Sequence, residues 1–162
     1  MVATTTRAII GGTGTEAWTE ATLLETRTIV TRYGRASAPA QHLSVAGERC
    51  WMLSRHGAGH DVAPHRINYR ANIQALADLG VEEIVALNAV GIIDTEVQCG
   101  GLVMPEQLID YTWGRHSTFA DGVSAPLQHI AFDPPYTPGL RAALISAASA
   151  AGMPVIATGV MG

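Results

Sequence analysis

The stretch Cys50-Trp51-Met52-Leu53-Ser54-Arg55-His56-Gly57 decides the fold, because a short apolar run ends there in an Arg-His-Gly corner. A short apolar run that is followed by a glycine turn is typical of a buried strand. In open α/β sheets, ligands bind just beyond the carboxyl ends of the strands. Arg55 offers a rigid fork of donors that suits an oxyanion, and His56 offers a donor whose charge changes near neutral pH. The stretch therefore predicts an α/β fold with an anion-binding corner, the alternative being a solvated loop.

The rest of the chain alternates between short apolar runs and two stretches with helical spacing. Pro64 can open the first helix and Gly80 can end it, and a second helix is expected over 138–151. The wholly apolar run 84–87 is typical of a central strand that is buried on both faces. Together these elements predict a mixed sheet with helices on its faces. Further strands are expected at 8–10, 26–31, 42–47, 101–104 and 155–157, with a loop-rich segment at 114–138.

The composition predicts one compact domain over 1–162, since 48% of the residues are apolar and 15% are charged. A net charge of −4 argues against nucleic-acid and anionic-membrane partners, which would need a basic stripe. All ten cationic residues are arginines, which excludes a Schiff-base or P-loop lysine and leaves arginine to bind any anion. Cys50 and Cys99 are expected to be free, buried thiols. No signal peptide or membrane-spanning run is visible, so we expect a cytoplasmic protein.

Three of the expected strands end in groups that can bind an anion. Gly12-Thr13-Gly14 offers backbone N–H groups and a hydroxyl in a turn that glycine permits. Arg55-His56 offers charge, and Asn88-Ala89 offers an amide side chain and further backbone N–H groups. If the three strands are neighbours in the sheet, these donors converge on a pocket about the size of one phosphate.

Parts of the same residues also fit the patterns of two other ligand classes, dinucleotides and zinc. Residues 12–17 fit the loose dinucleotide pattern G-x-G-x-x-G/A, but the chain that follows is β-rich and Arg32 and Tyr33 stand where an acid is needed. His56 and His60 have a spacing that holds zinc on a helix, but glycines and Pro64 disfavour a helix there. We therefore predict neither a dinucleotide cofactor nor a metal.

Polar residues near this corner have both a structural and a functional interpretation. His60 is predicted to line the substrate site, whereas His65 is predicted to be structural or to cap a helix. Asn68 and Asn72 are predicted to tie the helix to the loop of His56, the alternative being contacts to substrate hydroxyls.

Five motifs, in this order along the chain, resemble those of the purine nucleoside phosphorylase superfamily. Within it, the chain is most similar to the methylthioadenosine and methylthioinosine phosphorylases. Segments 88–91 and 109–112 are closest to the bacterial S-methyl-5′-thioinosine phosphorylases. The motifs are Ile9–Gly14, Arg55–Gly57, Pro64–Asn72, Asn88–Gly91 and Gln107–Thr112.

The resemblance implies a mixed, partly barrel-like β-sheet flanked by helices in a three-layer α/β/α arrangement. It also implies a pentosyltransferase that cleaves the N-glycosidic bond of a purine nucleoside with inorganic phosphate as co-substrate and no cofactor. The favoured substrate is S-methyl-5′-thioinosine; the alternatives are methylthioadenosine or another purine nucleoside, and a non-catalytic phosphate- or nucleoside-binding fragment. By the same resemblance, the residues that contact phosphate are Thr13, Arg55, His56, Asn88 and Ala89.

Two further expectations follow from the resemblance. The family is homotrimeric, and His129 matches a position that enters a neighbouring subunit's pocket near the 5′ substituent of the substrate. The family's base-binding motifs and its general acid would begin beyond Gly162, so we expect the 162 residues to be a C-terminally truncated domain with little turnover alone. The residues that distinguish 6-oxo from 6-amino purines would lie in the same part.

Overall fold

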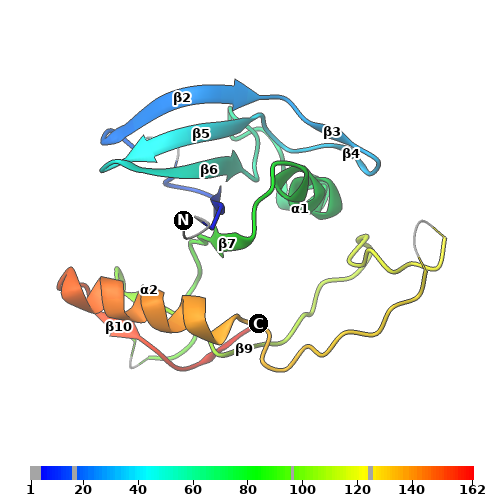
Figure 1. Cartoon of the computed structure of the whole chain (residues 1–162). Coiled ribbons are helices and arrows are strands. Elements are labelled where there is room, and N and C mark those ends of the chain that lie inside the picture. Colours follow the sequence, from blue (N-terminus) through cyan, green and yellow to red (C-terminus); the bar gives the residue numbers. More distant parts are fainter. Residues whose placement is uncertain (1–4, 16–17, 96, 124–125) are drawn as a thin grey trace. The chain divides into compact units, whose positions relative to one another are not determined.

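The structure is a computed structural model that describes residues 5–15, 18–95, 97–123 and 126–162. These residues form two compact units, residues 1–90 with 115–119 and residues 91–114 with 120–162, which are described separately. The first unit is built around a mixed sheet with the strand order β2-β5-β6-β1-β7 (Figure 1). Its strands are β1 (Arg7–Gly11), β2 (Ala21–Arg27), β5 (Ala40–Val45), β6 (Glu48–Ser54) and β7 (Glu83–Ala86).

The parallel core of this sheet is β6-β1-β7, with β1 in the centre. The register pairs Ile10 with Leu53 on one side and with Ala86 on the other. Strands β2 and β5 extend the sheet in antiparallel fashion beyond β6. Because side chains alternate along a strand, Ala8 and Ile10 face the same side of the sheet as Trp51 and Leu53 and bury a common apolar layer with them.

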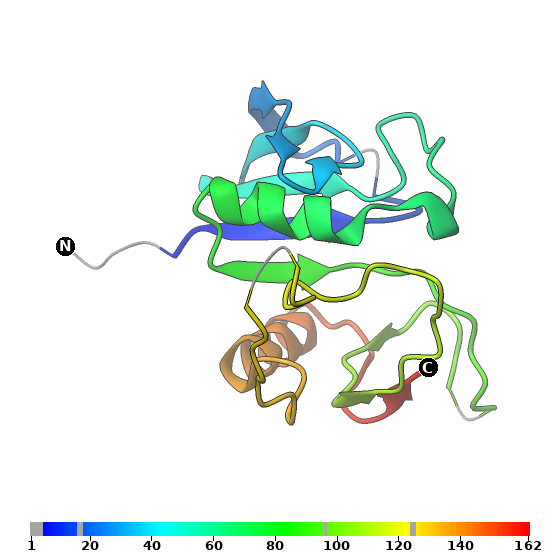
Figure 2. The ribbon, with the colours of Figure 1, turned by 90° about the vertical axis from the view of Figure 1, so that its right-hand side faces the viewer.

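Helix α1 (Tyr69–Asp78) covers that apolar layer, and Figure 2 shows it running alongside the strands. Leu76 of α1 is fully buried in the core cluster of the sheet. Asn68 caps the helix, because its side-chain oxygen accepts from the Ala71 N–H at 3.1 Å. Gly80 has a φ of +76°, which places it as the left-handed residue that ends the helix, as predicted.

Several element boundaries differ from the sequence-based expectations. Pro64 opens a separate 3₁₀ turn (η1, Pro64–Arg66), and the helix itself begins only after Ile67 has adopted an extended conformation. The strand expected at 26–31 is divided, since the ladder with β5 ends at Arg27 and the chain enters a small hairpin. That hairpin consists of β3 (Val30–Thr31) and β4 (Gly34–Arg35).

The position of β7 is the main topological correction. We expected a central strand buried on both faces, but β7 lies at one edge of the sheet that the described residues form, and its residues are at most half-buried. β1 takes the central place instead. The predicted mixed α/β architecture itself is confirmed.

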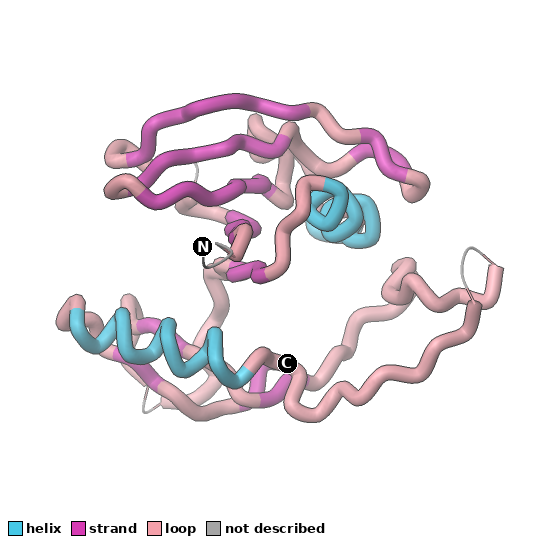
Figure 3. Tube along the Cα trace, viewed as in Figure 1, coloured by secondary structure: helices cyan, strands magenta, loops and turns pink. Residues whose placement is uncertain are grey.

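The second unit contains helix α2 (Pro138–Ala150), close to the predicted 138–151, and two short parallel pairs. Figure 3 shows the described residues between β9 and α2 as loop, in agreement with the loop-rich segment expected there. In neither unit do the described residues form a helix with the length and hydropathy of a membrane span. The pairs join β8 (Leu102–Val103) to β10 (Val155–Ile156) and β9 (Gln107–Leu108) to β11 (Val160–Met161).

Candidate anion-binding site

The carboxyl ends of β1, β6 and β7 lie next to one another, because the three strands are parallel neighbours. Backbone hydrogen bonds continue past the ladder: the Arg55 N–H donates to Gly11 O at 3.1 Å, and the Leu87 N–H donates to Ile10 O at 3.0 Å. The turn after β1 is closed by Thr15, whose hydroxyl donates to Gly12 O at 2.7 Å. The three predicted corners therefore start from one edge of the sheet.

Arg55 ties the corner after β6 to the end of β7. Its Nη1 donates to the carbonyl oxygen of Leu87 at 2.6 Å. Its guanidinium also lies against Gly12, so closely that a Cβ on residue 12 would overlap with it. One carbonyl takes one of the five N–H donors of the guanidinium, and the others can serve an anion.

Hydrogen bonds between His56 and Val62 fold the segment after Arg55 back on itself. The Val62 N–H donates to the His56 backbone oxygen at 2.8 Å, and the His56 ring Nδ1 lies 3.0 Å from Val62 O. Gly57 has a φ of +85°, a backbone conformation that favours glycine. The ring of His60 lies beside that of His56, at a centroid distance of 4.8 Å and tilted by 30°.

These corners line an open hollow of about 600 Å³. The predicted site residues Thr13, Arg55, His56, His60 and Ala89 all line it. Arg55 and His56 are half-buried, whereas Thr13, His60 and Ala89 are exposed, so the charged groups are the more enclosed ones.

Two predicted site residues are not brought into this hollow. Asn88 directly precedes Ala89, but its side chain is exposed and is not part of the lining. His129 is exposed and belongs to the second unit, so its role toward a neighbouring subunit stays a prediction.

Among the lining residues that the sequence reasoning missed, two carry polar side chains, Asp61 and Tyr69. The Asp61 carboxylate lies against Gly57, where a Cβ would touch it. Tyr69 opens α1, and its hydroxyl accepts from Arg115 Nη1 at 3.2 Å. The available signal for Tyr69 was its place directly after the capping Asn68, since the first helical residue lies next to the preceding loop.

The polar residues near the corner are structural, but with other partners than predicted. Asn68 donates to Tyr33 O at 2.6 Å, and Asn72 accepts from the Ser37 N–H at 2.7 Å. They tie α1 to the chain between β3 and β5 and not to the loop of His56. His65 is exposed on η1 and does not line the hollow, and its predicted structural role stays a prediction.

The structure also bears on the dinucleotide pattern, the histidine spacing and the two cysteines that the sequence analysis considered. β2 begins at Ala21, so among the described residues no helix follows the glycine turn as a dinucleotide site requires. The described part of the chain contains no group of three or more His, Cys, Asp or Glu side chains that could hold a metal ion. Both cysteines are free, but the prediction of burial is wrong for Cys99, which is exposed, and Cys50 is only half-buried.

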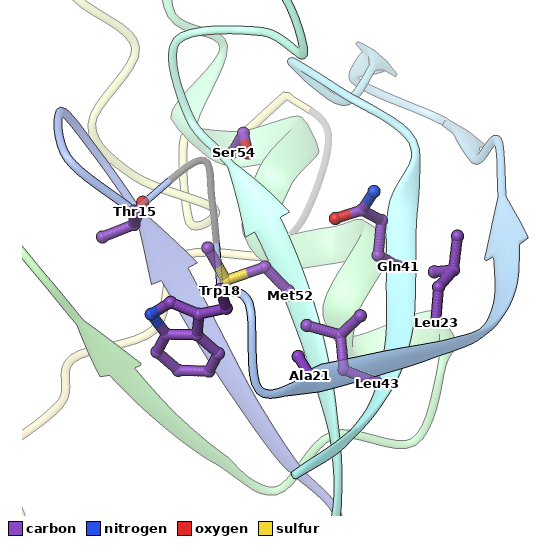
Figure 4. A pocket seen from close by; sticks show the side chains of 8 residues that line it. All are labelled: Thr15, Trp18, Ala21, Leu23, Gln41, Leu43, Met52 and Ser54. Atoms are coloured by element: carbon purple, nitrogen blue, oxygen red, sulfur yellow. The ribbon is translucent and has the colours of Figure 1, made fainter.

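A second, smaller cavity of about 180 Å³ lies on the other face of the sheet (Figure 4). Trp18, Leu43 and Met52 give it an apolar wall, and the hydroxyls of Thr15 and Ser54 lie at its margin. None of the described residues that line it is titratable. The hollow at the strand ends is therefore the candidate site.

Comparisons with known proteins identify relatives of this chain. The chain is 42% identical over 155 residues to the "Probable S-methyl-5′-thioinosine phosphorylase" of Xanthomonas campestris pv. campestris, covering 96% of this chain and 62% of that protein. It is 42% identical over 152 residues to the "6-oxopurine nucleoside phosphorylase" of Pyrococcus furiosus, covering 91% and 56%. It thus spans about three fifths of the length of these relatives.

The fold has counterparts among solved structures as well. The methylthioadenosine phosphorylase from Schistosoma mansoni in complex with adenine superposes with a TM-score of 0.90 and 31% sequence identity, covering 97% of this chain and 64% of that one. The family model described as "Phosphorylase superfamily" matches residues 6–162. The chain therefore belongs to the phosphorylase superfamily.

Proposed function

We propose that this chain supplies the phosphate-binding part of a nucleoside phosphorylase. The enzyme would cleave a 5′-methylthio purine nucleoside, S-methyl-5′-thioinosine being the favoured substrate, to the free purine and 5-methylthioribose 1-phosphate. Inorganic phosphate is the co-substrate, and no other cofactor takes part.

One observation carries this proposal: Thr13, Arg55, His56 and Ala89, from the ends of three adjacent parallel strands, line one hollow. A guanidinium, an imidazole, a hydroxyl and backbone N–H groups form a donor set that suits phosphate. The names of the relatives support the same chemistry, and the 6-oxo substrate is favoured because the Xanthomonas campestris relative is named for it.

The donor set also fits the demands of the reaction. Phosphate is a weak nucleophile, so the rate depends on holding it in position and on stabilising an oxocarbenium-like sugar. A phosphate bound by Arg55 and His56 brings negative charge to the developing cation. A general acid must protonate the departing purine, and we propose no residue of this chain for that role.

The phosphate site is tested by titrating the 162-residue chain with inorganic phosphate in a calorimeter. We expect saturable binding, and a loss of at least about tenfold in affinity for Arg55→Ala, because a charge-assisted hydrogen bond contributes about 1.5–3 kcal/mol. Arg49→Ala is the matched control, since it removes the same charge from an exposed position at the opposite end of β6. The absence of phosphate binding, or an equal loss in both variants, would contradict the proposal.

The reaction is tested by measuring the purine released from S-methyl-5′-thioinosine, methylthioadenosine and inosine with and without phosphate. The chain is assayed alone, where we expect little turnover, and joined to the part of the Xanthomonas campestris relative that it does not match. In the joined protein we expect phosphate-dependent release that is fastest with S-methyl-5′-thioinosine. A folded joined protein that releases purine at the same rate without phosphate would refute the reaction, and a preference for methylthioadenosine would refute the substrate.

The proposal includes a homotrimer in which His129 enters the pocket of a neighbouring subunit. Its support is that three apolar side chains close to His129 in the sequence are exposed, namely Leu127, Ile130 and Phe132. Contiguous exposed apolar surface marks protein interfaces. Sedimentation velocity should give a mass three times the 17.0 kDa of one chain, and a monomer at micromolar concentration would contradict the trimer.

A further inference from the structure

The hydrogen bond of His56 fixes which ring nitrogen carries a proton. Nδ1 lies 3.0 Å from the backbone oxygen of Val62, and a carbonyl oxygen can only accept. Nδ1 is therefore the N–H donor of this bond. The reciprocal bond from the Val62 N–H to the His56 oxygen, at 2.8 Å, holds the two backbone segments together and keeps the ring in this orientation.

The proton on Nδ1 determines what Nε2 offers to a ligand in the hollow that His56 lines. In the neutral ring, Nε2 has a lone pair and accepts a hydrogen bond; in the imidazolium, Nε2 becomes a second donor. A neutral His56 ring that donates through Nδ1 to Val62 O therefore presents Nε2 as an acceptor.

Phosphate and sulfate differ in their match to such an acceptor. Above neutral pH the phosphate dianion still carries one P–OH proton, which it can donate to Nε2. The sulfate dianion carries none, so its oxygens would face the Nε2 lone pair unless the ring first takes up a proton. We propose that His56 is a specificity-determining residue that makes the hollow prefer phosphate over sulfate at alkaline pH. This inference rests on the proposed phosphate site.

Among the other charged and titratable groups of the hollow, Arg55 and Tyr69 do not account for the discrimination, and His60 and Asp61 are tested directly. Arg55 donates to either dianion, since its guanidinium has no acceptor. The Tyr69 hydroxyl already accepts from Arg115. The His60 ring lies beside the His56 ring and Asp61 lies against Gly57, so each needs a direct test as an alternative acceptor for the P–OH proton.

The test is a pair of calorimetric titrations of the wild-type chain, with inorganic phosphate and with sulfate, at constant ionic strength in an oxyanion-free buffer. Between about pH 7.5 and pH 9, the sulfate affinity should fall as the pH rises, by up to about tenfold per pH unit, because sulfate binding to the neutral ring requires one proton. The phosphate affinity should change by less than about threefold over the same range. Parallel pH dependences for the two anions would overturn the inference.

Two variants of similar shape distinguish the roles of the two ring nitrogens of His56, Nδ1 and Nε2. His56→Asn keeps a donor near the Val62 carbonyl and removes the Nε2 position, and His56→Gln keeps a polar group near Nε2 that does not titrate. In both, the phosphate-to-sulfate affinity ratio should no longer change with pH. A ratio that still rises with pH in a folded variant would overturn the role of His56. If neither variant folds, the wild-type titrations alone decide.

Asp61→Asn and His60→Gln test the two alternative acceptors. In both variants the phosphate-to-sulfate affinity ratio should still rise with pH. Loss of the rise in either of them, with retention in His56→Gln, would assign the discrimination elsewhere and overturn the inference. Failure of the inference is distinguishable from failure of the proposed function. Binding of both anions with equal pH dependence refutes only the former, whereas no binding of either anion refutes both.

Discussion

The guanidinium of Arg55 lies where a Cβ on residue 12 would stand, so Gly12 leaves room for a side chain from the neighbouring strand end. No positive φ requires glycine at this position. The requirement comes from the close approach of β1 and β6 at their carboxyl ends, where Arg55 also donates to Leu87 O. The position of the Arg55 guanidinium, the proposed anion-binding group, therefore depends on the presence of glycine at position 12, just beyond the end of β1.

Gly12→Ala is expected to weaken phosphate binding by at least about tenfold, because the added methyl group displaces the guanidinium from its place beside Leu87 O. Calorimetric titration with phosphate measures the loss. Gly59→Ala is the matched control, since it adds the same methyl group in the corner after β6, where no atom lies within 4 Å of the added Cβ. Equal affinities in the two variants would show that Arg55 finds an equivalent position.

Asn72→Ala is expected to lower the free energy of unfolding by about 1–3 kcal/mol, because it leaves the N–H and the hydroxyl of the half-buried Ser37 without their partner. Asn72 is 2% exposed, accepts from the Ser37 N–H and donates to the Ser37 hydroxyl at 3.0 Å. Urea denaturation measures the change. Gln74→Ala, which removes a surface hydrogen bond to Asp78 on the same helix, should change stability by less than about 0.5 kcal/mol. A similar loss in both variants would contradict the structural role of Asn72.

The sequence predicts the strand ends well because their signals are local. An apolar run followed by glycine or by a polar corner marks β1 and β6, and the adjacency of their ends follows once the strands are parallel. Helix α2 is predicted almost to the residue, since Pro138 and Gly152 mark its two ends.

What could not be predicted depends on contacts between distant residues. The hairpin β3–β4 has only two residues per strand and is held by the Thr31 hydroxyl, which donates to Gly34 O, and by Asn68, which donates to Tyr33 O. The place of β7 at one edge of the described sheet depends on which strands pair, which its apolar run does not encode. Asp61 enters the hollow only because the His56–Val62 bonds fold the corner back, and no local pattern predicts those bonds.

Arg141→Ala is expected to loosen the second unit locally. The Arg141 guanidinium donates to three carbonyl oxygens at the ends of β8 and β10: those of Met104 at 2.9 Å, Pro105 at 3.0 Å and Ala157. Hydrogen exchange of the Leu102 and Met104 amides, which bond to Pro154 and Ile156, should accelerate by about tenfold or more.

Arg141→Lys is the matched variant for this effect. It keeps the charge but cannot reproduce the planar fork, so we expect an intermediate acceleration. Exchange rates that stay at the wild-type value in Arg141→Ala would show that the carbonyl contacts contribute nothing to holding β8 against β10.

The two free thiols should differ in their reaction with iodoacetamide. Burial raises the pKa of the Cys50 thiol above its ordinary value, and Cys99 is exposed. The thiolate is the reacting species, so a raised pKa leaves less thiolate on Cys50 at any given pH and slows its alkylation. At about pH 8, Cys99 should be labelled about threefold to tenfold faster, as measured by mass spectrometry of the tryptic peptides. The difference should narrow as the pH rises toward the raised pKa, and it should vanish in urea, where both thiols are solvated. Equal labelling rates in the folded chain would contradict the burial of Cys50 in the sheet.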